Sequence, residues 1–197
     1  MSKFEKMIPF ILHCEAGLAT KHMTKPLEEQ FEIAKRTGYG NDPCDSGGAT
    51  MCGVTIATYE SYCRRKGYAR PTIERLKAIP FDHWKEILKS MFWDRWRADE
   101  INTDMVAVAL VDWTWLSGRH GITKPQALLG VTTDGIVGGK TIAAVNGHPD
   151  QRQLFNRIQA ARNAFHASIA RPGTTNAKFL KGWNRRVAMI TWEGFKF

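Results

Sequence analysis

The sequence predicts a mainly α protein, and three observations support this fold class. From residue 56 onward, apolar residues recur at the spacing of one helical face, over about 56–66, 72–78, 81–93, 103–116, 139–145, 150–170 and 176–192. The stretch 105–116 is apolar nearly all round, which is typical of a helix buried on every side. Residues 38–55 are dense in Gly, Asn, Asp and Pro, which predicts a small irregular or hairpin loop between the helices.

Length and composition set limits on this fold. With 197 residues, of which 43% are hydrophobic, the chain can build one compact domain with its own core, with or without a small appendage. No apolar run approaches the ~18 residues that a bilayer requires, so no transmembrane segment is expected. The N-terminus lacks an apolar stretch followed by a small-residue cleavage site, so no cleaved signal peptide is visible.

The first predicted helix carries an apolar stripe that leads to a carboxylate. The stripe has the three-and-four spacing of one helical face and consists of Phe4, Met7, Ile8, Ile11 and Leu12. Glu15 continues it. Because Pro9 lies inside the pattern, the helix either begins later than Ser2 suggests or kinks at this proline.

Residues 18–37 are polar and are interpreted as an inserted excursion. They could hold a short helix over 26–35, with Pro26 in its first turn and Leu27, Phe31 and Ala34 facing inward. Because this core-forming potential is small, we expect the segment to loop out, at little cost in closure entropy.

Asp112 and the tryptophans are the residues of the helical region whose burial matters most for the fold. Asp112 lies within the apolar stretch 105–116 and would need a partner if it is buried. The seven tryptophans fall at helical spacings, so most of them are expected in the core: Trp84, Trp93, Trp96, Trp113, Trp115, Trp183 and Trp192.

The charge is concentrated at the C-terminal end. Residues 151–197 hold nine Lys or Arg against one acid, Glu193, out of a total net charge of +9. Such an end should attract a polyanion, which could be nucleic acid, an anionic membrane or the anionic polymers of a bacterial wall. Solvated helix faces would explain the same composition. No nucleic-acid reading motif is recognisable, so nucleic acid is not the expected partner.

The four cysteines give little support to a metal site. Cys14, Cys44, Cys52 and Cys63 contain no C-x-x-C pair, so a zinc knuckle is poorly supported, and no metal or organic cofactor is expected. His13 and Cys14 do not form a nucleophile and base, because adjacent helical positions point about 100° apart.

Glu15 and the Gly-rich loop after it could carry glycosidase chemistry. A carboxyl group that is partly desolvated keeps its proton more readily and can deliver it to a glycosidic oxygen. The loop supplies a second carboxylate, Asp45, and the hydroxyl of Thr50. In an inverting glycosidase such a second carboxylate activates water, with the two carboxyl groups about 6.5–9.5 Å apart. The alternative is that Glu15 is an exposed helix-end charge and Asp45 an ordinary turn residue.

Several motifs in order resemble glycoside hydrolase family 108, which contains lysozyme-like muramidases, some of them described as secretion activators. They are Glu15-Ala16-Gly17, Tyr-Gly-Asn-Asp-Pro at 39–43, Asp-Ser-Gly-Gly-Ala-Thr at 45–50 and Gly-Val-Thr at 53–55. Counterparts follow at 92–96, around Asp112 and Trp113, at 129–138 and at 179–186. Two departures are that Glu-Gly-Gly-Tyr becomes Glu15-Ala16-Gly17-Leu18, and that about twenty residues intervene before Tyr39. The unit 128–146 also resembles the core of a small peptidoglycan-binding motif.

The resemblance implies a fold, a division and a site. It implies a lysozyme-like catalytic region over 1–125, with 18–37 as an insertion, and a helical peptidoglycan-binding-like region over 126–197. Glu15 is then the catalytic acid, with Asp45 and Thr50 beside it in the cleft. The substrate-binding residues are then Tyr39, Asn41, Asp42 and Gly48, with the ring of Tyr39 available to stack on a sugar face.

We therefore expect an N-acetylmuramidase without cofactor that cleaves the glycan strand of peptidoglycan, held on anionic wall polymers by its basic end. It would be made in the bacterial or phage-infected cytoplasm and act in the periplasm or at the cell wall after release outside the Sec route. The first alternative is a non-catalytic wall-binding or secretion-assisting protein with the same fold. The second alternative is a nucleic-acid-binding helical protein, which the charge alone suggests.

Overall fold

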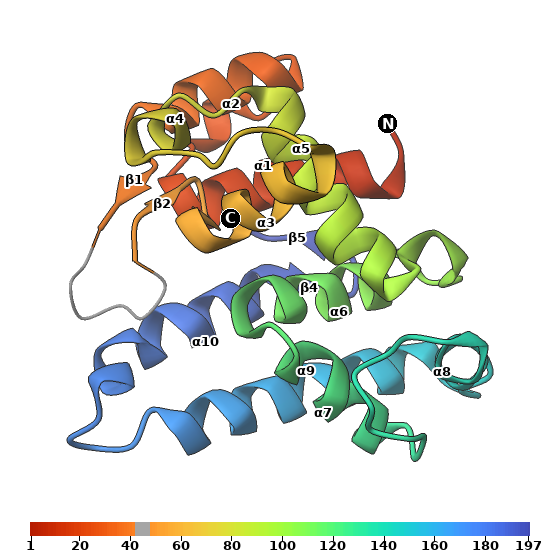
Figure 1. Ribbon diagram of the computed structural model, residues 1–197. Coiled ribbons are helices and arrows are strands. Elements are labelled where there is room, and N and C mark those ends of the chain that lie inside the picture. The colour runs from red at the N-terminus through yellow and green to blue at the C-terminus, as the bar shows by residue number, and fades with distance from the viewer. Residues whose placement is uncertain (42–47) are drawn as a thin grey trace. The chain divides into compact units, whose positions relative to one another are not determined.

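The computed structural model describes residues 1–41 and 48–197, and in these ranges the protein is mainly α, as the sequence predicts (Figure 1). The helices are α1 (Lys3–Ala16), α2 (Leu27–Lys35), α3 (Ile56–Lys66), α4 (Ile73–Lys77), α5 (Phe81–Leu88), α6 (Asp104–Ser117), α7 (His120–Leu128), α8 (Gly139–Asn146), α9 (Gln151–Ile169) and α10 (Leu180–Met189). The chain forms two compact units, Met1–Lys89 and Ser90–Phe197. The predicted division between residues 125 and 126 stays a prediction.

The other elements are short. The strands have two residues each: β1 (Tyr39–Gly40), β2 (Thr50–Met51), β3 (Val54–Thr55), β4 (Ile190–Thr191) and β5 (Gly194–Phe195). The short 3-10 helices are η1 (Thr20–His22), η3 (Asp94–Trp96), η4 (Ala98–Glu100) and η5 (Thr175–Phe179), and η2 (Lys89–Trp93) is a short π-helix. No described helix has the length and apolar character needed to cross a membrane.

Helix α1 starts at the residue that its sequence signals indicate. The Ser2 side chain accepts a hydrogen bond from the Glu5 N–H, and the Glu5 carboxylate accepts one from the Ser2 N–H, which completes a capping box. The helix therefore begins at Lys3, with Pro9 inside it. The apolar stripe is buried as predicted.

The expectation that residues 18–37 loop away from the core does not fit their helix. Helix α2 packs against α1 and α5, and Phe31 and Ala34 are completely or almost completely buried. The Phe31 ring centroid lies 5.5 Å from that of Phe81 and 5.3 Å from that of Trp84. The segment thus contributes to the core of the first unit, because the Phe31 ring packs against two other aromatic rings and buries a large apolar area.

The predicted hairpin region forms a three-stranded antiparallel sheet in the order β1-β2-β3. Tyr39 pairs with Met51 and Gly40 with Thr50, while Thr50 also pairs with Thr55 on the other side. Two residues, Cys52 and Gly53, connect β2 to β3 with φ angles of 47° and 80°. Positive φ at both positions is characteristic of the type I′ turn that joins two-residue hairpins.

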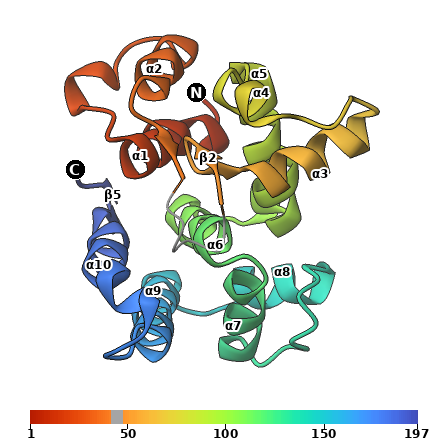
Figure 2. The ribbon, with the colours of Figure 1, turned by 60° about the vertical axis from the view of Figure 1, so that its left-hand side comes forward.

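In the second unit, α6 is the central helix, as its apolar sequence predicts. It packs against α7 and α9, and α9 packs in turn against α10 (Figure 2). Helix α7 was not among the predicted helices. A Cβ atom on Gly121 of α7 would lie 2.4 Å from the Thr114 backbone, so a glycine is required for this close approach of the two helices. Trp93, Trp96 and Trp113 of this unit are fully buried, as is Trp84 of the first.

A buried charge cluster joins three helices of the second unit. Asp112 of α6 is fully buried, and it lies 2.8 Å from Nη2 of Arg162 of α9 and 2.7 Å from Nη2 of Arg186 of α10. Burial alone would raise the pKa of the Asp112 carboxyl, but the two guanidinium groups outweigh this effect and lower it. Asp112 therefore has the partners that its position in an apolar helix demands.

This cluster changes the interpretation of the basic C-terminal end. Arg162 and Arg186 are buried structural residues, so they cannot attract a polyanion. Seven of the nine basic residues remain exposed: Arg152, Arg157, Arg171, Lys178, Lys181, Arg185 and Lys196. The predicted last helix, 176–192, is also too long. Helix α10 ends at Met189, and residues 190–195 form the β4–β5 hairpin, with Gly194 at a φ of 135°.

Candidate active site

The end of α1 fixes the position of Glu15. Gly17 follows the helix with a φ of 67°, and its N–H donates to the His13 carbonyl group, an arrangement that ends a helix sharply. The His13 Nδ1–H donates to the Leu18 carbonyl group at 2.7 Å, and Leu18 is buried. Glu15 is half-buried, one residue before the helix ends.

The strand β1 is held against this helix end. The Thr37 hydroxyl donates to the Ala16 carbonyl group at 2.8 Å. A Cβ atom on Gly38 would lie 2.5 Å from Cys52 Sγ and 3.1 Å from the Ala16 Cβ atom. Only glycine fits here, because the end of α1 and the β2–β3 turn both approach the chain at this point.

The β2–β3 turn is anchored on both sides and lies next to the end of α1. The Cys52 N–H donates to the Gly38 carbonyl group at 2.8 Å, and Trp84 Nε1–H donates to the Cys52 carbonyl group at 3.0 Å. Burial raises the pKa of the Cys52 thiol to about 12, and the negative charge of Glu15 adds to this shift. Ala16, the residue after Glu15, approaches the same glycine, Gly38, as Cys52 does, so the end of α1 lies next to this turn.

The remaining predicted site residues fall into two groups. Tyr39 and Thr50 lie on adjacent strands of the sheet, while Asn41 is exposed and Gly48 has a φ of 64°. Asp42 and Asp45 lie outside the described residues.

Tyr39 already has a cationic neighbour. Its side chain is 37% exposed, and Nζ of Lys77 lies 4.4 Å from the centroid of its ring. This distance is within the range of a cation–π interaction. A sugar that stacks on this face of Tyr39 would have to displace Lys77 or use the other face.

Sequence reasoning missed three residues around the candidate site. The turn at Cys52 could have been found, since a residue followed by Gly between two short apolar runs indicates a hairpin. The hydrogen bond from Trp84 and the placement of Lys77 over Tyr39 had no sequence signal, because they join segments 32 and 38 residues apart.

Comparisons with known proteins match both halves of the chain. The family model of glycosyl hydrolase 108 matches residues 31–118, and that of a predicted peptidoglycan domain matches residues 120–188. The first match begins within α2, so it does not include Glu15. No curated protein matches the chain.

Ten chains of solved structures match. One is the structure of SagA from Brucella abortus, which is 26% identical in sequence, with a TM-score of 0.72. The match covers 95% of this chain and 90% of the SagA chain.

Proposed function

Because this chain joins a glycosyl hydrolase 108 domain to a predicted peptidoglycan domain, as its motifs implied, we propose that it hydrolyses the glycan strand of peptidoglycan as an N-acetylmuramidase. The two matches together support a glycoside hydrolase that acts on peptidoglycan, with peptidoglycan as its partner and the cell wall as its place of action. The proposed bond is the one between N-acetylmuramic acid and N-acetylglucosamine. The hydrolytic region extends over 1–125 in this proposal and the wall-binding region over 126–197.

Glu15 is the proposed general acid. Its side chain is half-buried at the end of α1, beside a turn that is fixed by Gly38 and Trp84, so the carboxyl group is held by a rigid surrounding. The proton of this carboxyl group passes to the glycosidic oxygen as the bond to the anomeric carbon breaks. The position of Glu15 at the end of α1, which meets the chain just before β1, is the observation that carries the proposal.

Asp45 is the proposed base. It takes a proton from the water molecule that attacks the anomeric carbon from the opposite face, which produces the free sugar hydroxyl. Thr50 and Tyr39, on adjacent strands, belong to the proposed cleft together with Asn41, Asp42 and Gly48. Peptidoglycan would be held in addition by the exposed basic residues of the C-terminal end.

The test is the chemistry of the fragments that the protein releases from purified peptidoglycan. After borohydride reduction, mass spectrometry should find reduced muramic acid at the new ends if the proposed bond is cleaved. Glu15→Gln should lower the rate at least ~100-fold with the fold intact, since general acid catalysis contributes this much. Glu28→Gln, an exposed carboxylate in the first turn of α2, is the control and should keep the rate. Near-normal turnover by folded Glu15→Gln would refute the mechanism.

One observation favours a second candidate, a wall-binding protein of the same fold without turnover. The family match begins at residue 31, so the segment that carries Glu15 lies outside it. Sedimentation with purified cell walls measures binding, and analysis of the supernatant measures soluble glycan fragments. A non-catalytic protein would bind the walls and release no fragments, whereas a hydrolase would release them.

A further inference from the structure

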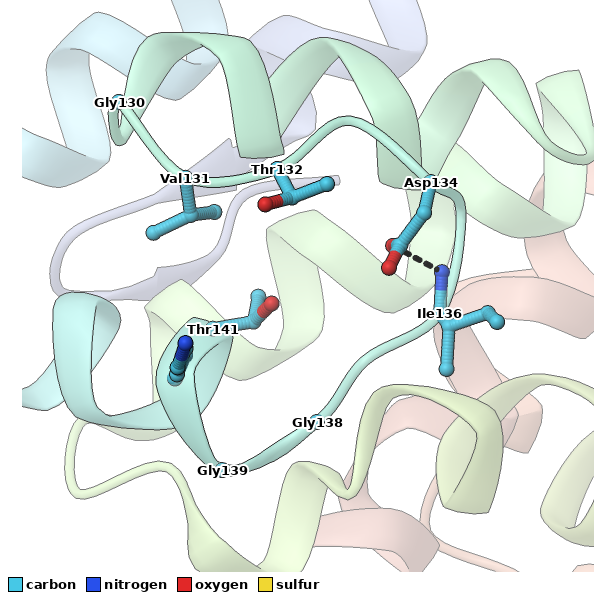
Figure 3. A pocket seen from close by; sticks show the side chains of 9 residues that line it. Gly130, Val131, Thr132, Asp134, Ile136, Gly138, Gly139 and Thr141 are labelled. Carbon is cyan, nitrogen blue, oxygen red and sulfur yellow. Dashed lines mark hydrogen bonds between the residues drawn. The ribbon is translucent and has the colours of Figure 1, made fainter.

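The second unit contains a pocket within the region that matches the predicted peptidoglycan domain. It has a volume of about 520 Å³ and lies where the loop between α7 and α8 curves around the start of α8 (Figure 3). We call it the loop pocket. Its polar lining residues are Thr132, Asp134, Lys140 and Thr141, and its apolar ones are Val131 and Ile136, with glycines between them.

The loop is held in place without any ligand. Gln126 of α7 is 1% exposed, and its Nε2 donates to Asp134 Oδ1 at 2.9 Å and to the Ile136 carbonyl group at 3.0 Å. Its Oε1 accepts from the Gly135 N–H, and Arg119 donates to the Asp134 carbonyl group. Because the walls are fixed in advance, a ligand would not have to order them, which favours binding.

One wall of the loop pocket presents donors that have no acceptor. Helix α8 has no side-chain cap, and its first hydrogen bond runs from the Ile142 N–H to the Gly138 carbonyl group. Within the described parts of the chain, the N–H groups of Gly139, Lys140 and Thr141 have no acceptor. Such N–H groups at a helix start attract anions, and the Lys140 side chain adds a positive charge.

Thr141 gives an independent indication of a ligand. The residue is only 4% exposed, yet its side chain lines the pocket and lies inside the curve of the loop (Figure 3). Its hydroxyl group makes no hydrogen bond to any described residue. A polar group in this position is satisfied by a bound molecule or by solvent in the pocket.

The other wall presents an acceptor and an apolar edge. Hydrogen bonds from the Ile136 N–H and from Gln126 lower the pKa of Asp134, so this side chain is a carboxylate at neutral pH. Ile136 is 69% exposed, and half-buried Val131 lies at the opposite end of the loop (Figure 3). The pocket therefore offers donors for one carboxylate, an acceptor for an amide N–H or an amine, and a surface for a methyl group.

This combination distinguishes between components of a bacterial wall. An uncharged sugar would leave the Lys140 charge and three N–H groups without an anion. A phosphate dianion would be repelled by the Asp134 carboxylate more strongly than a monoanion is. A short peptide with a free carboxylate, an amide N–H and small side chains matches all three features.

We propose that the loop pocket binds the carboxylate end of a peptidoglycan stem peptide, so that the second unit recognises the peptide and not the glycan. The choice of this peptide among other carboxylates rests on the proposed action on peptidoglycan. The carboxylate lies at the start of α8, against Thr141 and Lys140, and the peptide N–H faces Asp134.

The test is a titration of the full chain, followed by NMR of the amide groups, with N-acetylmuramyl-L-alanyl-D-isoglutamine as the probe. The signals of residues 138–141 should shift. The same compound with its carboxylate converted to an amide should bind at least ~10-fold more weakly, the scale of a lost hydrogen bond to a charged group. Tri-N-acetylchitotriose and inorganic phosphate are the competing ligands. Equal binding of the amide, or tighter binding of either competitor at residues 138–141, would overturn the proposal.

Variants assign the contacts. Thr141→Val keeps the shape of the side chain, and Lys140→Met keeps its length; each should weaken binding of the probe about 3- to 10-fold. Lys124→Met, which removes an exposed charge from α7 outside the pocket lining, is the matched control and should bind normally. Normal binding by both Thr141→Val and Lys140→Met would refute the site.

These experiments distinguish a failure of the pocket proposal from a failure of the hydrolase proposal. Glu15→Gln should bind the probe like the wild type, because the loop pocket lies in the second unit. If glycan fragments are released but residues 138–141 do not respond to the probe, the loop pocket is wrong and the hydrolase proposal stands. If the probe binds and no fragments appear, the pocket is supported and the hydrolase proposal fails.

Discussion

Helix α1 of the first unit and helix α6 of the second are both buried, but they are stabilised in different ways. The described residues of α1 present an apolar stripe, and the first unit buries one polar side chain among its described residues, Gln30. Helix α6 buries Asp112 between two arginines of other helices. The first core thus depends on the fit of shapes, whereas the second also depends on a balance of charges, and equal burial does not mean equal sensitivity to mutation.

The largest expected effect removes the charge of Asp112 and keeps its shape. Asp112→Asn leaves Arg162 and Arg186 buried without their counter-charge, which should lower the free energy of unfolding by about 3–5 kcal/mol. Denaturant titration measures this loss. Glu193→Gln, which breaks an exposed ion pair with Arg152, is the control and should cost less than about 1 kcal/mol. If the two variants unfold at the same denaturant concentration, the second core does not depend on charge.

The next effect tests the fit of shapes in the first unit. Gly38→Ala places a methyl group 2.5 Å from Cys52 Sγ and 3.0 Å from the Ala34 carbonyl oxygen, so the surrounding chain must shift. We expect a loss of about 1–3 kcal/mol in the free energy of unfolding. The control is Gly182→Ala in α10, where no atom lies within 4 Å and a gain of up to about 1 kcal/mol is expected. A neutral Gly38→Ala would show that the end of α1 is loosely packed.

The third prediction concerns pH. The pKa of His166 is lowered to about 4 by burial and by the positive charge of Arg162, since His166 packs beside the charge cluster. The unfolded chain, with a histidine pKa of about 6.5, binds more protons between pH 6.5 and 4. The free energy of unfolding should therefore fall by about 2–3 kcal/mol as the pH drops through this window.

The control for this prediction replaces His166 with phenylalanine, a ring of similar size that does not titrate. The pKa of His83 in the first unit is also lowered, mainly by burial. A pH dependence of the wild type could therefore come from either histidine. His166→Phe should remove the part that belongs to the second unit. An unchanged pH dependence in this variant would show that His166 does not contribute. Protonation of Asp112 acts at lower pH, because its pKa lies below the ordinary value.

The smallest effect on stability is expected at the surface of the C-terminal end. Replacing exposed Arg157, Lys181 and Arg185 with Gln should change the free energy of unfolding by about 0.5 kcal/mol or less for each residue. If these charges hold the protein on anionic wall polymers, sedimentation with walls should weaken at low salt. The change should be smaller near 0.5 M salt, where the Debye length is below about 5 Å. Arg186→Gln should instead lower stability, and equal behaviour of Arg185→Gln and Arg186→Gln would contradict the division into exposed and buried charges.

Local patterns in the sequence predicted much of the fold. The spacing of apolar residues located α1, α3 and α6, because helical periodicity is written into neighbouring residues. Helix α7 was missed because Gly121 and Pro125 both lower helix propensity, and its close packing on α6 outweighs this local preference. The end of α10 was misplaced because Ile190 and Thr191 suit a strand as well as a helix, and only the pairing with β5 decides between the two.

The site was predictable only in part, for a similar reason. The motif around Glu15 is local in sequence, and so is the need of Asp112 for a partner. The identity of the partners is not, because Arg186 lies 74 residues from Asp112 along the chain. The pairing of Glu15 with Asp45 stays a prediction, and so does the role of Thr50.

The close contact between α6 and α7 bears on how such proteins can be recombined. One family match ends at residue 118 and the next begins at residue 120, which suggests a natural point for exchanging modules. Yet α6, on one side of this point, packs against α7 and α9 on the other, and Thr114 touches Gly121 too closely for any side chain. A fragment that starts at residue 120 would lose Asp112 and leave Arg162 and Arg186 without their carboxylate. A fragment that is to fold after transfer to another protein must therefore include α6. The boundary between the two matched families is not a boundary between folding units.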